Sequence, residues 1–301
     1  MYNFDGQVIV ITGAGRGLGR TYALAFASRG ANVVAIDNGC ELDGSGTDPS
    51  FIDDLIDLIE DIGVTPDGYC ADVTDRQAMQ QIIDETYDKY GRIDGLICNA
   101  GLMIPQEKSL DSLDLYRLHM EVNHFASVAL AQIVLPKMQD AGQGRILFTG
   151  GLSSLYGDER LTAFAASCSA NMGFVKCMAR ELESSNIQAN VIIPANFSRI
   201  SSLLSLDYDY EIMTPDLVAP AALWLMSTNA PNGMMATAGG GYYSIAESIE
   251  KNGETLDMGN QRPQEVARVL TKVNSGANNK TFVSFKVRMQ FVLKQLMLKR
   301  S

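Results

Sequence analysis

A glycine-rich turn near the N-terminus is the part of the sequence best suited to hold a phosphate. It reads Thr12-Gly13-Ala14-Gly15-Arg16-Gly17-Leu18-Gly19 and follows a short apolar run, 8–12. Glycines allow a tight turn and a close approach of the backbone to a pyrophosphate. The pyrophosphate then lies at the N-terminus of the next helix, where unpaired N–H groups and the helix dipole favour an anion. Glycine is also common in turns for steric reasons alone, so the prediction depends on its context.

An aspartate at the end of the next apolar run supplies that context. Asp37 lies near the spacing expected for a carboxylate that accepts hydrogen bonds from the hydroxyls of the adenosine ribose. A carboxylate there also repels a 2′-phosphate, so NAD is favoured over NADP as the cofactor. The alternative is an aspartate that only caps the turn that follows it.

Seven short apolar runs must position these groups. They span residues 8–12, 32–36, 68–71, 93–98, 145–149, 188–193 and 234–238. They are rich in β-branched residues and lack strict alternation, which is typical of strands buried on both faces of a parallel sheet. Amphipathic stretches separate them, so the sequence predicts an α/β fold: a Rossmann-type, doubly wound parallel sheet of about seven strands with helices on both faces.

One of the predicted helices shows its two faces directly in the sequence. Between residues 50 and 61, apolar side chains recur at helical spacing and aspartates take the opposite side. The apolar positions are Ile52, Leu55, Ile56 and Ile59, and the acidic ones are Asp53, Asp54, Asp57 and Asp61. A long glycine-containing loop, 38–50, precedes this helix.

The strand and helix pattern weakens after residue 253, which predicts two parts. We expect a Rossmann domain over 1–253 and a helical C-terminal extension over 254–301, with a polar loop at 274–280. Residues 282–298 are apolar but interspersed with Lys and Arg, and no acidic residue follows Glu265. This basic end could dock on the chain's own body, on a partner or on anionic phosphate, and we favour docking on protein.

Composition excludes several classes of function. The net charge of −11 argues against general nucleic-acid binding, which needs a basic surface. Five cysteines are scattered without CxxC or Cys/His spacing, so no metal site and a reducing cytoplasm are predicted. The N-terminus has no leader pattern, and no apolar run is long enough to span a bilayer, so the chain is expected to be cytoplasmic.

Two further motifs complete a family pattern. Asp72-Val73 follows the third predicted strand and Asn99-Ala100-Gly101 the fourth. Together with Thr12-Gly13-x-x-x-Gly17-x-Gly19, they resemble the short-chain dehydrogenase/reductase family. Within that family the chain is most similar to the (3R)-hydroxyacyl-CoA dehydrogenase module of peroxisomal multifunctional enzymes. The similarity is carried by segments 4–8, 17–27, 90–94 and 218–225 and by the loop after Asp37, and it extends to about residue 248 with a weaker match at 262–266.

This resemblance implies a cofactor site for NAD. Asp72 and Val73 would flank the adenine, Asn99 to Gly101 would support the central strand and line the cleft, and residues 194–199 would lie near the nicotinamide. The expected cofactor-binding residues are Thr12, Gly13, Arg16, Gly17, Leu18, Gly19, Asp37, Asp72, Val73, Asn99, Ala100 and Gly101.

The resemblance also locates the chemical site, and there the chain departs from the family. Family members transfer a proton with a tyrosine, whose pKa is lowered by a lysine one helical turn later, while a serine polarises the carbonyl. Ungapped spacing places Phe164 at the tyrosine position, Cys168 at the lysine position and Gly151 at the serine position. Only Asn123 matches the fourth active-site residue, an asparagine that supports a water relay. The lost lysine also removes one anchor for the cofactor ribose, so NAD binding would be weaker or lost.

Other residues near these positions carry functional groups. Tyr156 corresponds to a structural tyrosine of the family, and Ser153 or Ser154 would need a shift in register. Cys168 has no adjacent histidine, and we interpret it as a packing residue of its helix. His119 and His124 are the two histidines of the chain, and His124 is expected to lie on a helix face.

These observations lead to three hypotheses for the function. The first is a catalytically inactive homologue that serves as a non-catalytic subunit beside an intact short-chain dehydrogenase, in a heteromeric NAD-dependent enzyme of the hydroxyacyl-CoA type. The resemblance implies that the helices bearing Asn123 and Phe164 form oligomer contacts, either with that partner or in a homo-oligomer. The second is a stand-alone NAD(H)-binding sensor, and the third is an oxidoreductase with atypical catalytic residues.

Overall fold

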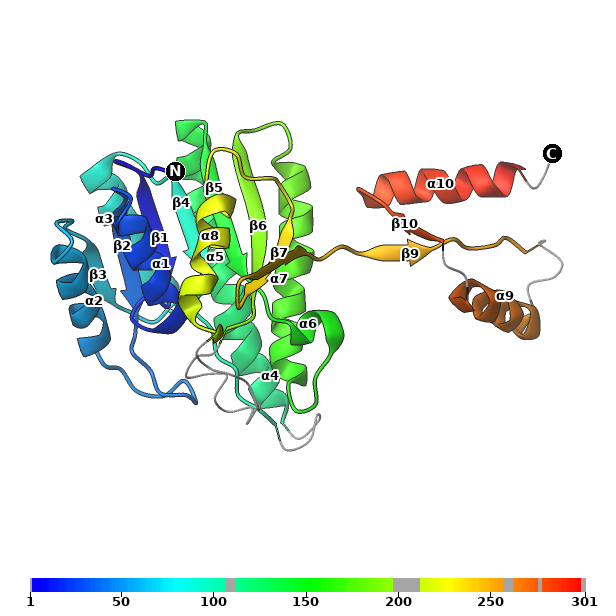
Figure 1. Ribbon diagram of the computed structural model, residues 1–301, viewed down its shortest axis with the longest axis horizontal. Helices are drawn as coiled ribbons and strands as arrows, with labels where there is room; N and C mark the ends of the chain where they lie inside the picture. The colour runs from blue at the N-terminus through cyan, green and yellow to red at the C-terminus, as the bar shows by residue number, and fades with distance from the viewer. Residues whose placement is uncertain (1, 107–111, 197–211, 257–261, 276–277, 299–301) are drawn as a thin grey trace. The chain divides into compact units, whose positions relative to one another are not determined.

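The chain folds around a parallel sheet whose strands follow the predicted runs. A computed structural model describes residues 2–106, 112–196, 212–256, 262–275 and 278–298 (Figure 1). Each of the seven predicted strands is present, with ends within two residues of the prediction. Their bounds are β1 Val8–Thr12, β2 Asn32–Asp37, β3 Asp67–Cys70, β4 Gly95–Cys98, β5 Gly144–Thr149, β6 Ile187–Pro194 and β7 Met235–Gly239.

The order of the strands places a ligand cleft between the two halves of the sheet. The order is β3-β2-β1-β4-β5-β6-β7-β8, so the winding reverses between β1 and β4. Folds of this kind bind ligands outside the carboxyl ends of the strands at that point. The last strand, β8 (Tyr242–Ile245), pairs antiparallel with β7 and was not predicted, because its four residues are mostly exposed and form no buried apolar run. The predicted fold class is confirmed, with this one antiparallel strand added at the edge.

Helices cover both faces of the sheet (Figure 1). On one face α1 contacts both α2 and α8, while on the other α3 contacts α5, and α7 packs on β5 and β6. Strand β1 lies between these layers, and all five of its residues are buried. The helix bounds are α1 Gly17–Ala27, α2 Ser50–Glu60, α3 Arg76–Tyr90, α5 Ala126–Ala141, α7 Thr162–Glu181 and α8 Ala219–Leu225.

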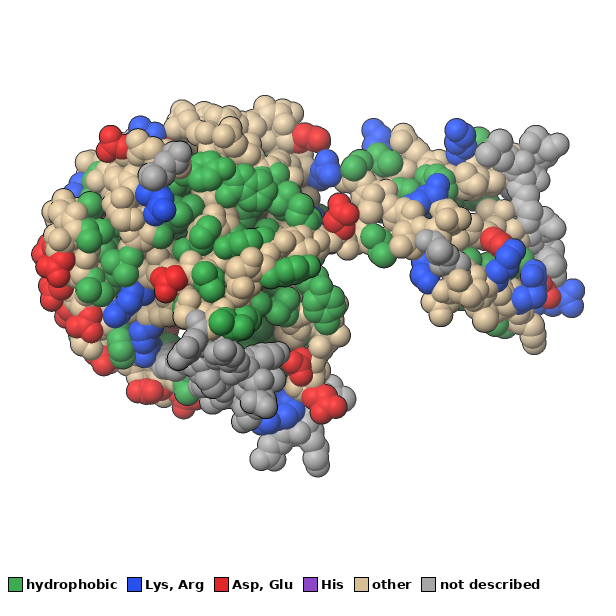
Figure 2. Space-filling view, viewed as in Figure 1, with side chains coloured by type: hydrophobic (Ala, Val, Ile, Leu, Met, Phe, Trp, Pro, Cys, Tyr) green, Lys and Arg blue, Asp and Glu red, His purple; other side chains and the backbone are tan. Residues whose placement is uncertain are grey.

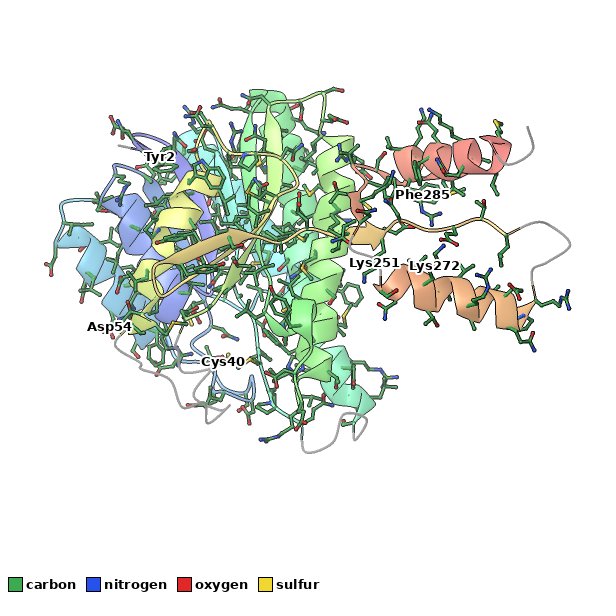
Figure 3. The ribbon with its side chains drawn as sticks, turned by 45° about the vertical axis from the view of Figure 1, so that its right-hand side comes forward. Tyr2, Cys40, Asp54, Lys251, Lys272 and Phe285 are labelled. Atoms are coloured by element: carbon green, nitrogen blue, oxygen red, sulfur yellow. The ribbon has the colours of Figure 1, made fainter. Side chains whose placement is uncertain are left out.

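Helix α2 shows how the sequence pattern becomes packing. Its apolar side chains Ile52, Leu55 and Ile59 are buried, while the predicted acidic face is exposed. In Figure 2 acidic side chains accordingly gather at the left edge, where Figure 1 draws α2, and Asp54 points outward in Figure 3. The amphipathic prediction for this helix is therefore confirmed.

A short stretch of π-helix joins α4 (Leu113–Met120) to α5. This turn, η1, spans Glu121–Phe125 and carries Asn123 in its middle. Single π-helical turns inside α-helices are frequent at functional sites, because they rotate one side chain out of the regular helical register. Two short segments complete the first part of the chain, α6 (Ser153–Tyr156) and the 3₁₀ turn η4 (Pro215–Leu217).

The residues after Ile245 form a compact unit of their own, separate from Met1–Ile245. It contains β9 (Ile249–Lys251), α9 (Pro263–Ser275), β10 (Asn279–Thr281) and α10 (Phe285–Leu298), and β9 pairs antiparallel with β10. Lys251, Lys272 and Phe285 mark it in Figure 3. The division of the chain into a Rossmann domain over 1–253 and a helical C-terminal extension over 254–301 stays a prediction.

The polar loop predicted at 274–280 is partly wrong. Asn274 and Ser275 end α9, and Asn279 and Lys280 begin β10, while 276–277 lie outside the described residues. A short exposed strand has the same polar composition as a loop, so the sequence does not distinguish them. One basic residue of the terminal helix, Arg288, pairs with Glu250 on β9 at 2.9 Å, within the same unit.

Candidate functional site

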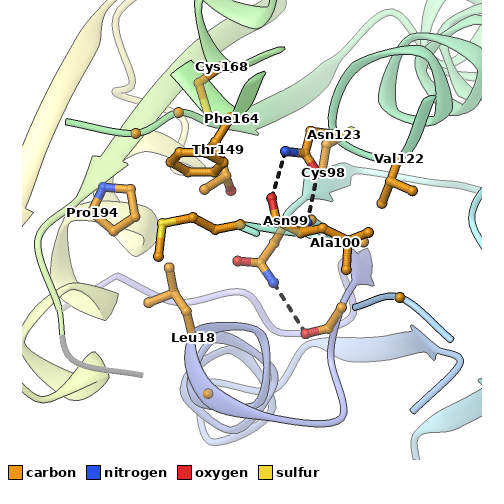
Figure 4. Close-up of a pocket in the computed structure, with 18 of the residues that line it drawn as sticks. Leu18, Cys98, Asn99, Ala100, Val122, Asn123, Thr149, Phe164, Cys168 and Pro194 are labelled. Carbon is orange, nitrogen blue, oxygen red and sulfur yellow. Dashed lines mark hydrogen bonds between the residues drawn. The ribbon is translucent and has the colours of Figure 1, made fainter. Parts of the chain in front are cut away.

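A cavity of about 690 Å³ lies at the carboxyl ends of the parallel strands. All the expected cofactor-binding residues line it except Thr12 and Gly19, which are buried. The four positions of the predicted chemical site, Asn123, Gly151, Phe164 and Cys168, line the same cavity (Figure 4). The structure therefore brings the two predicted sites together in one cleft.

The glycine turn is too tight for side chains at two of its positions. Gly13 has a φ of +65°, and a Cβ atom there would lie 2.8 Å from the Cα of Ala100. A Cβ at Gly19 would lie 1.9 Å from the carbonyl oxygen of Gly13. Glycine at these positions lets the first turn of α1 pack directly on the end of β1, as the dinucleotide-binding motif requires.

The N-terminus of α1 is open to the cavity. Its N-cap residue, Arg16, makes no side-chain capping bond, and the first turn contains no acidic residue. Gly17 and Leu18, the first two residues of the helix, line the cavity. Uncapped N–H groups and the helix dipole favour an anion here, so the turn fits a pyrophosphate.

Asp37 connects the glycine turn to the loop after β2. Its Oδ2 accepts a hydrogen bond from the Gly15 N–H at 2.9 Å, and its Oδ1 accepts one from the Gly39 N–H at 2.7 Å. The turn-capping contact considered from the sequence is therefore present. A carboxylate has about four acceptor positions, so capacity remains for ribose hydroxyls on the cavity side.

The loop after β2 forms part of the cavity wall. Arg16 stacks its guanidinium on Phe51 at 3.8 Å and donates a hydrogen bond to the Cys40 carbonyl at 2.6 Å. A Cβ at Gly44 would lie 2.9 Å from Leu102 Cδ1, so the loop reaches the segment that follows β4. The sequence predicted this long loop but gave no signal that Cys40 and Gly44 would line the site.

Asn99 holds the end of β4 against the glycine turn. Its side-chain nitrogen donates to the carbonyls of Thr12 and Gly13 at 3.1 and 3.2 Å. The Thr12 hydroxyl in turn accepts from the N–H groups of Asn99 and Ala100 at 3.0 and 3.1 Å. These contacts agree with the supporting role that the resemblance implied. Asp72, at the cavity wall, accepts from the N–H and hydroxyl of Thr74.

Gly151, Phe164 and Cys168 meet at the other end of the cavity. A Cβ built on Gly151 would lie 2.7 and 2.9 Å from Cε1 and Cζ of Phe164, and 3.3 Å from the sulfur of Cys168. The phenyl ring therefore occupies the space that a side chain at position 151 would need. The three residues that the ungapped spacing assigned to the chemical site are therefore neighbours in the fold, while their assignment to family positions stays a prediction.

Cys168 is buried and carries no charge. Only 3% of its surface is exposed, and burial raises the pKa of its thiol to about 12. A neutral thiol cannot take the electrostatic role of an ammonium group. The interpretation of Cys168 as a packing residue agrees with this burial.

Asn123 has a structural role. Its Oδ1 accepts from the Leu102 N–H at 2.7 Å, and its Nδ2 donates to the Leu102 carbonyl at 2.9 Å and to the Ser167 hydroxyl at 3.0 Å. Its backbone carbonyl accepts from Asn171 Nδ2 at 2.9 Å. The side chain thus ties the segment after β4 to α7.

Neither histidine lines the cavity. Nδ1 of the fully buried His119 lies 2.8 Å from the Leu115 carbonyl, and its Nε2 accepts from the Ile104 N–H at 3.1 Å. The carbonyl requires a proton on Nδ1, and burial lowers the pKa of the ring, so His119 is neutral. His124 Nδ1 lies 2.8 Å from the Asn171 side-chain oxygen, on the helix face where it was expected.

The other residues that could replace the lost catalytic groups lie near the cavity but differ in exposure. Tyr156 lines its rim and is 78% exposed. Ser154 donates to the Gly151 carbonyl at 2.5 Å. The Ser153 hydroxyl is buried, and no described residue pairs with it. Pro194, Ala195 and Asn196 also line the cavity, whereas 197–199 lie outside the described residues.

An apolar wall was missed by sequence reasoning. It comes from four separate loops, and because loop residues have no periodicity, no pattern could have marked them. Its members are Leu102, Met103, Leu152, Leu161 and Met213.

Among the residues that the structure describes, no His, Cys, Asp and Glu side chains cluster closely enough to hold a metal. No helix among them is long and apolar enough to cross a membrane.

A parallel sheet with a glycine turn, an uncapped helix and an acidic residue at the end of β2 defines a Rossmann-type nucleotide-binding protein. The family model for short chain dehydrogenases matches residues 7–199, and the chain belongs to this family. The resemblance found in the sequence is therefore confirmed.

Individual relatives extend this comparison. Mouse peroxisomal multifunctional enzyme type 2 is 32% identical over 240 residues, which are 79% of this chain but 32% of that enzyme, so the chain spans about a third of its length. The full-length type 2 enzyme of Drosophila melanogaster shares the fold over 98% of this chain and 50% of its own, with a TM-score of 0.79 and 24% identity. A 7α-hydroxysteroid dehydrogenase in complex with NADH and 7-oxo glycochenodeoxycholic acid has a TM-score of 0.69 at 30% identity, over 80% of this chain and 95% of its own.

Proposed function

We propose that this chain binds NAD(H) but does not carry out hydride transfer, and that it serves as a non-catalytic subunit beside an intact homologue. The proposal depends on one observation above all. At the position where relatives place their proton-transfer group, the Phe164 ring packs on Gly151 and beside the buried thiol of Cys168.

The residues that would hold the cofactor are in place. The open N-terminus of α1 would bind the pyrophosphate, and Asp37 would accept hydrogen bonds from the adenosine ribose. Asp72 and Val73 would flank the adenine at the cavity wall. When bound, NAD supplies a hydride acceptor; the chain's own residues determine whether a proton can leave at the same time.

Proton transfer is the step that these residues cannot support. A positioned acid or base contributes ~10²–10⁴-fold to such a reaction. Phenylalanine has no ionisable group, and a thiol with a pKa of about 12 stays protonated at neutral pH. Glycine at 151 has no side chain that could donate to a developing oxyanion.

A subunit role is supported by the outer surface near η1. Leu113 and Phe125 are exposed by 64% and 50%, on the helical segment bearing Asn123 that the resemblance assigned to oligomer contacts. The partner's activity would be NAD-dependent oxidation of a 3-hydroxyacyl-CoA or a similar thioester, by analogy with the multifunctional enzymes that the chain resembles.

Purification of the tagged chain from its native cells, followed by mass spectrometry, tests this role. We expect co-purification of a homologue with Ser, Tyr and Lys at the positions of Gly151, Phe164 and Cys168. Phe125→Lys should abolish the association, whereas Leu58→Lys, at an exposed leucine on α2, should not. Recovery of the chain as a homo-oligomer without such a homologue would contradict the subunit role.

The second candidate is a stand-alone NAD(H)-binding sensor. It is favoured by the nucleotide residues, which remain together although the chemical site has changed. It predicts that the purified chain carries NAD(H) while no homologous partner accompanies it, so the same purification separates the two candidates.

A further inference from the structure

The C-terminal unit and the rest of the chain carry charges of opposite sign. Residues 246–301 contain ten Lys and Arg against five Asp and Glu, a net charge of +5, while the whole chain has a net charge of −11. The residues before 246 therefore carry −16, which is −11 minus +5. A surface of one sign selects partners of the other sign, so the C-terminal unit suits an anionic partner.

The positive charges that remain free in this unit lie on α10. Lys286 and Lys294 are exposed, and no carboxylate among the described residues pairs with either of them. The sequence continues after the helix with Lys299 and Arg300. Three carboxylates of the unit are already paired, in Glu250–Arg288, Glu254–Lys272 and Glu265–Arg268.

One side of α10 is covered by the strand pair β9–β10. Arg288 pairs with Glu250 on β9, and Nζ of Lys280 on β10 lies 4.1 Å from the centre of the Phe291 ring. That ring also contacts Phe282, with the two ring centres 5.4 Å apart. Only the opposite side of the helix is therefore open to another molecule.

The open side of α10 is an apolar ridge. Its members recur at spacings of four, four and three residues, which places them on one face of the helix. They are exposed by between 36% and 81% and are Phe285, Met289, Leu293 and Leu296. Figure 3 labels Phe285 at the start of this helix, and Figure 2 shows Lys and Arg side chains along the edge of the unit where Figure 1 draws α10. Lys286 and Lys294 each follow a ridge residue by one position, so both lie on the same flank of the ridge.

An apolar ridge with lysines on its flank suits the surface of a lipid bilayer. The apolar side chains enter the boundary of the acyl chains, while the long lysine stems reach the headgroup phosphates. A protein groove that encloses a helix needs access to the sides of that helix, and β9–β10 covers one side of α10. A bilayer is flat and needs only one open side. Among the targets that the sequence left open for this basic end, the structure therefore favours anionic phosphate over protein.

We propose that the C-terminal unit binds the surface of an anionic lipid bilayer through the apolar ridge of α10 and its flanking lysines. The helix has 14 residues, fewer than the roughly 20 that a membrane span needs, so it lies in the interface. The acidic remainder of the chain is repelled by the same surface and stays in water. This proposal goes beyond the proposed function and does not depend on whether NAD binds.

Sedimentation of the full chain with lipid vesicles tests the proposal. The probes are vesicles of phosphatidylcholine alone and vesicles in which about one lipid in three is phosphatidylserine. We expect binding to the anionic vesicles to be at least about tenfold tighter, and we expect release at roughly 0.5 M salt, where charges are screened. Absence of binding to the anionic vesicles, or equal binding to both kinds, would overturn the proposal.

Charge-reversal variants assign the binding to α10. Lys286→Glu with Lys294→Glu should weaken binding to the anionic vesicles by about tenfold or more, since each lysine near such a surface contributes about fivefold. Arg76→Glu with Arg180→Glu, at exposed sites on α3 and α7, changes the net charge by the same amount and should leave binding unchanged. An equal loss in both double variants would show that only net charge matters, and the proposal would be wrong.

Apolar variants test the ridge itself. Phe285→Gln with Leu293→Gln keeps the charges and should weaken vesicle binding by about tenfold, because less apolar surface is buried. Leu58→Gln, at an exposed leucine on α2, should have no effect. All the changed side chains are exposed, so circular dichroism should show the same helix content in each variant. Unchanged binding of Phe285→Gln with Leu293→Gln would remove the ridge from the bilayer contact.

Light scattering without vesicles tests the alternative occupant, which is a second copy of this chain. We expect the same molecular mass for the unchanged chain and for Phe285→Gln with Leu293→Gln. If the variant instead loses an oligomer that the unchanged chain forms, the ridge is covered by a second copy and the bilayer proposal is overturned.

Discussion

The Phe164 ring lies in the space that a side chain at position 151 would occupy. A Cβ at Gly151 would lie 2.7 Å from Cε1 of Phe164, closer than non-bonded carbon atoms approach. The two residues therefore depend on each other. The Phe164 ring can pack in this place only with glycine at position 151, and a serine at position 151 would collide with the ring. Restoring one catalytic residue at a time should consequently damage the protein.

Gly151→Ser should destabilise the fold by about 1–3 kcal/mol, because the added side chain must displace the ring of Phe164. Chemical denaturation measures the change. Gly173→Ser on α7 is the matched control, since a Cβ there meets no atom within 4 Å. In a Phe164→Ala background the cost of Gly151→Ser should fall; an unchanged cost would show that the ring is not its cause.

Asp37→Asn should weaken NAD+ binding about tenfold to a hundredfold, since a charged acceptor for ribose hydroxyls is replaced by an amide. Isothermal titration calorimetry gives the affinity. Asp53→Asn, on the exposed face of α2, should leave it unchanged. Equal affinities of the unchanged chain, Asp37→Asn and Asp53→Asn for NAD+ would show that Asp37 does not contribute to NAD+ binding.

Stability should decline in mild acid because of His119. Burial lowers the pKa of this ring below its usual 6.5, so the unfolded chain binds a proton more readily than the folded one. The fold is therefore fully stable above about pH 6.5 and loses stability as the pH falls from there toward the folded-state pKa. Urea denaturation at several pH values measures the slope, and His119→Asn should lower stability at neutral pH and flatten that slope. The same slope in the variant would assign the effect to other groups.

Cys168 should resist alkylation. With a pKa of about 12, roughly one thiol in ten thousand is ionised at pH 8, and the side chain is buried. Mass spectrometry after brief iodoacetamide treatment should find label on the exposed Cys70 and Cys177 first. Early modification of Cys168 would instead support the hypothesis of a nucleophilic cysteine and an atypical enzyme.

The sequence predicted those features that depend on local pattern. The continuous apolar run of β1 indicated a strand buried on both faces, and all five of its residues are buried. It did not predict β8, whose exposed residues Tyr242 and Tyr243 have no buried counterpart in the pattern.

Contacts between loops also could not be predicted from the sequence. The approach of Gly44 to Leu102 joins segments that follow different strands, and the apolar wall draws its members from four loops. Such contacts depend on how the loops pack in three dimensions, and no periodicity along the chain encodes that. Likewise, the resemblance matched Asn123 to a family position, but the sequence did not predict that its side chain would bond to Leu102 and Ser167.

The central claim is that the nucleotide site is kept while proton transfer is lost. The most direct measurement incubates the homogeneous chain with NAD+, at a concentration shown by calorimetry to saturate it, in a protein-free metabolite extract of its native cells. NADH formation is followed by absorbance, with an intact family member as the positive control. We predict bound NAD+ and no NADH above the protein-free rate. Sustained NADH formation that Ser153→Ala or Tyr156→Phe abolishes would contradict the account.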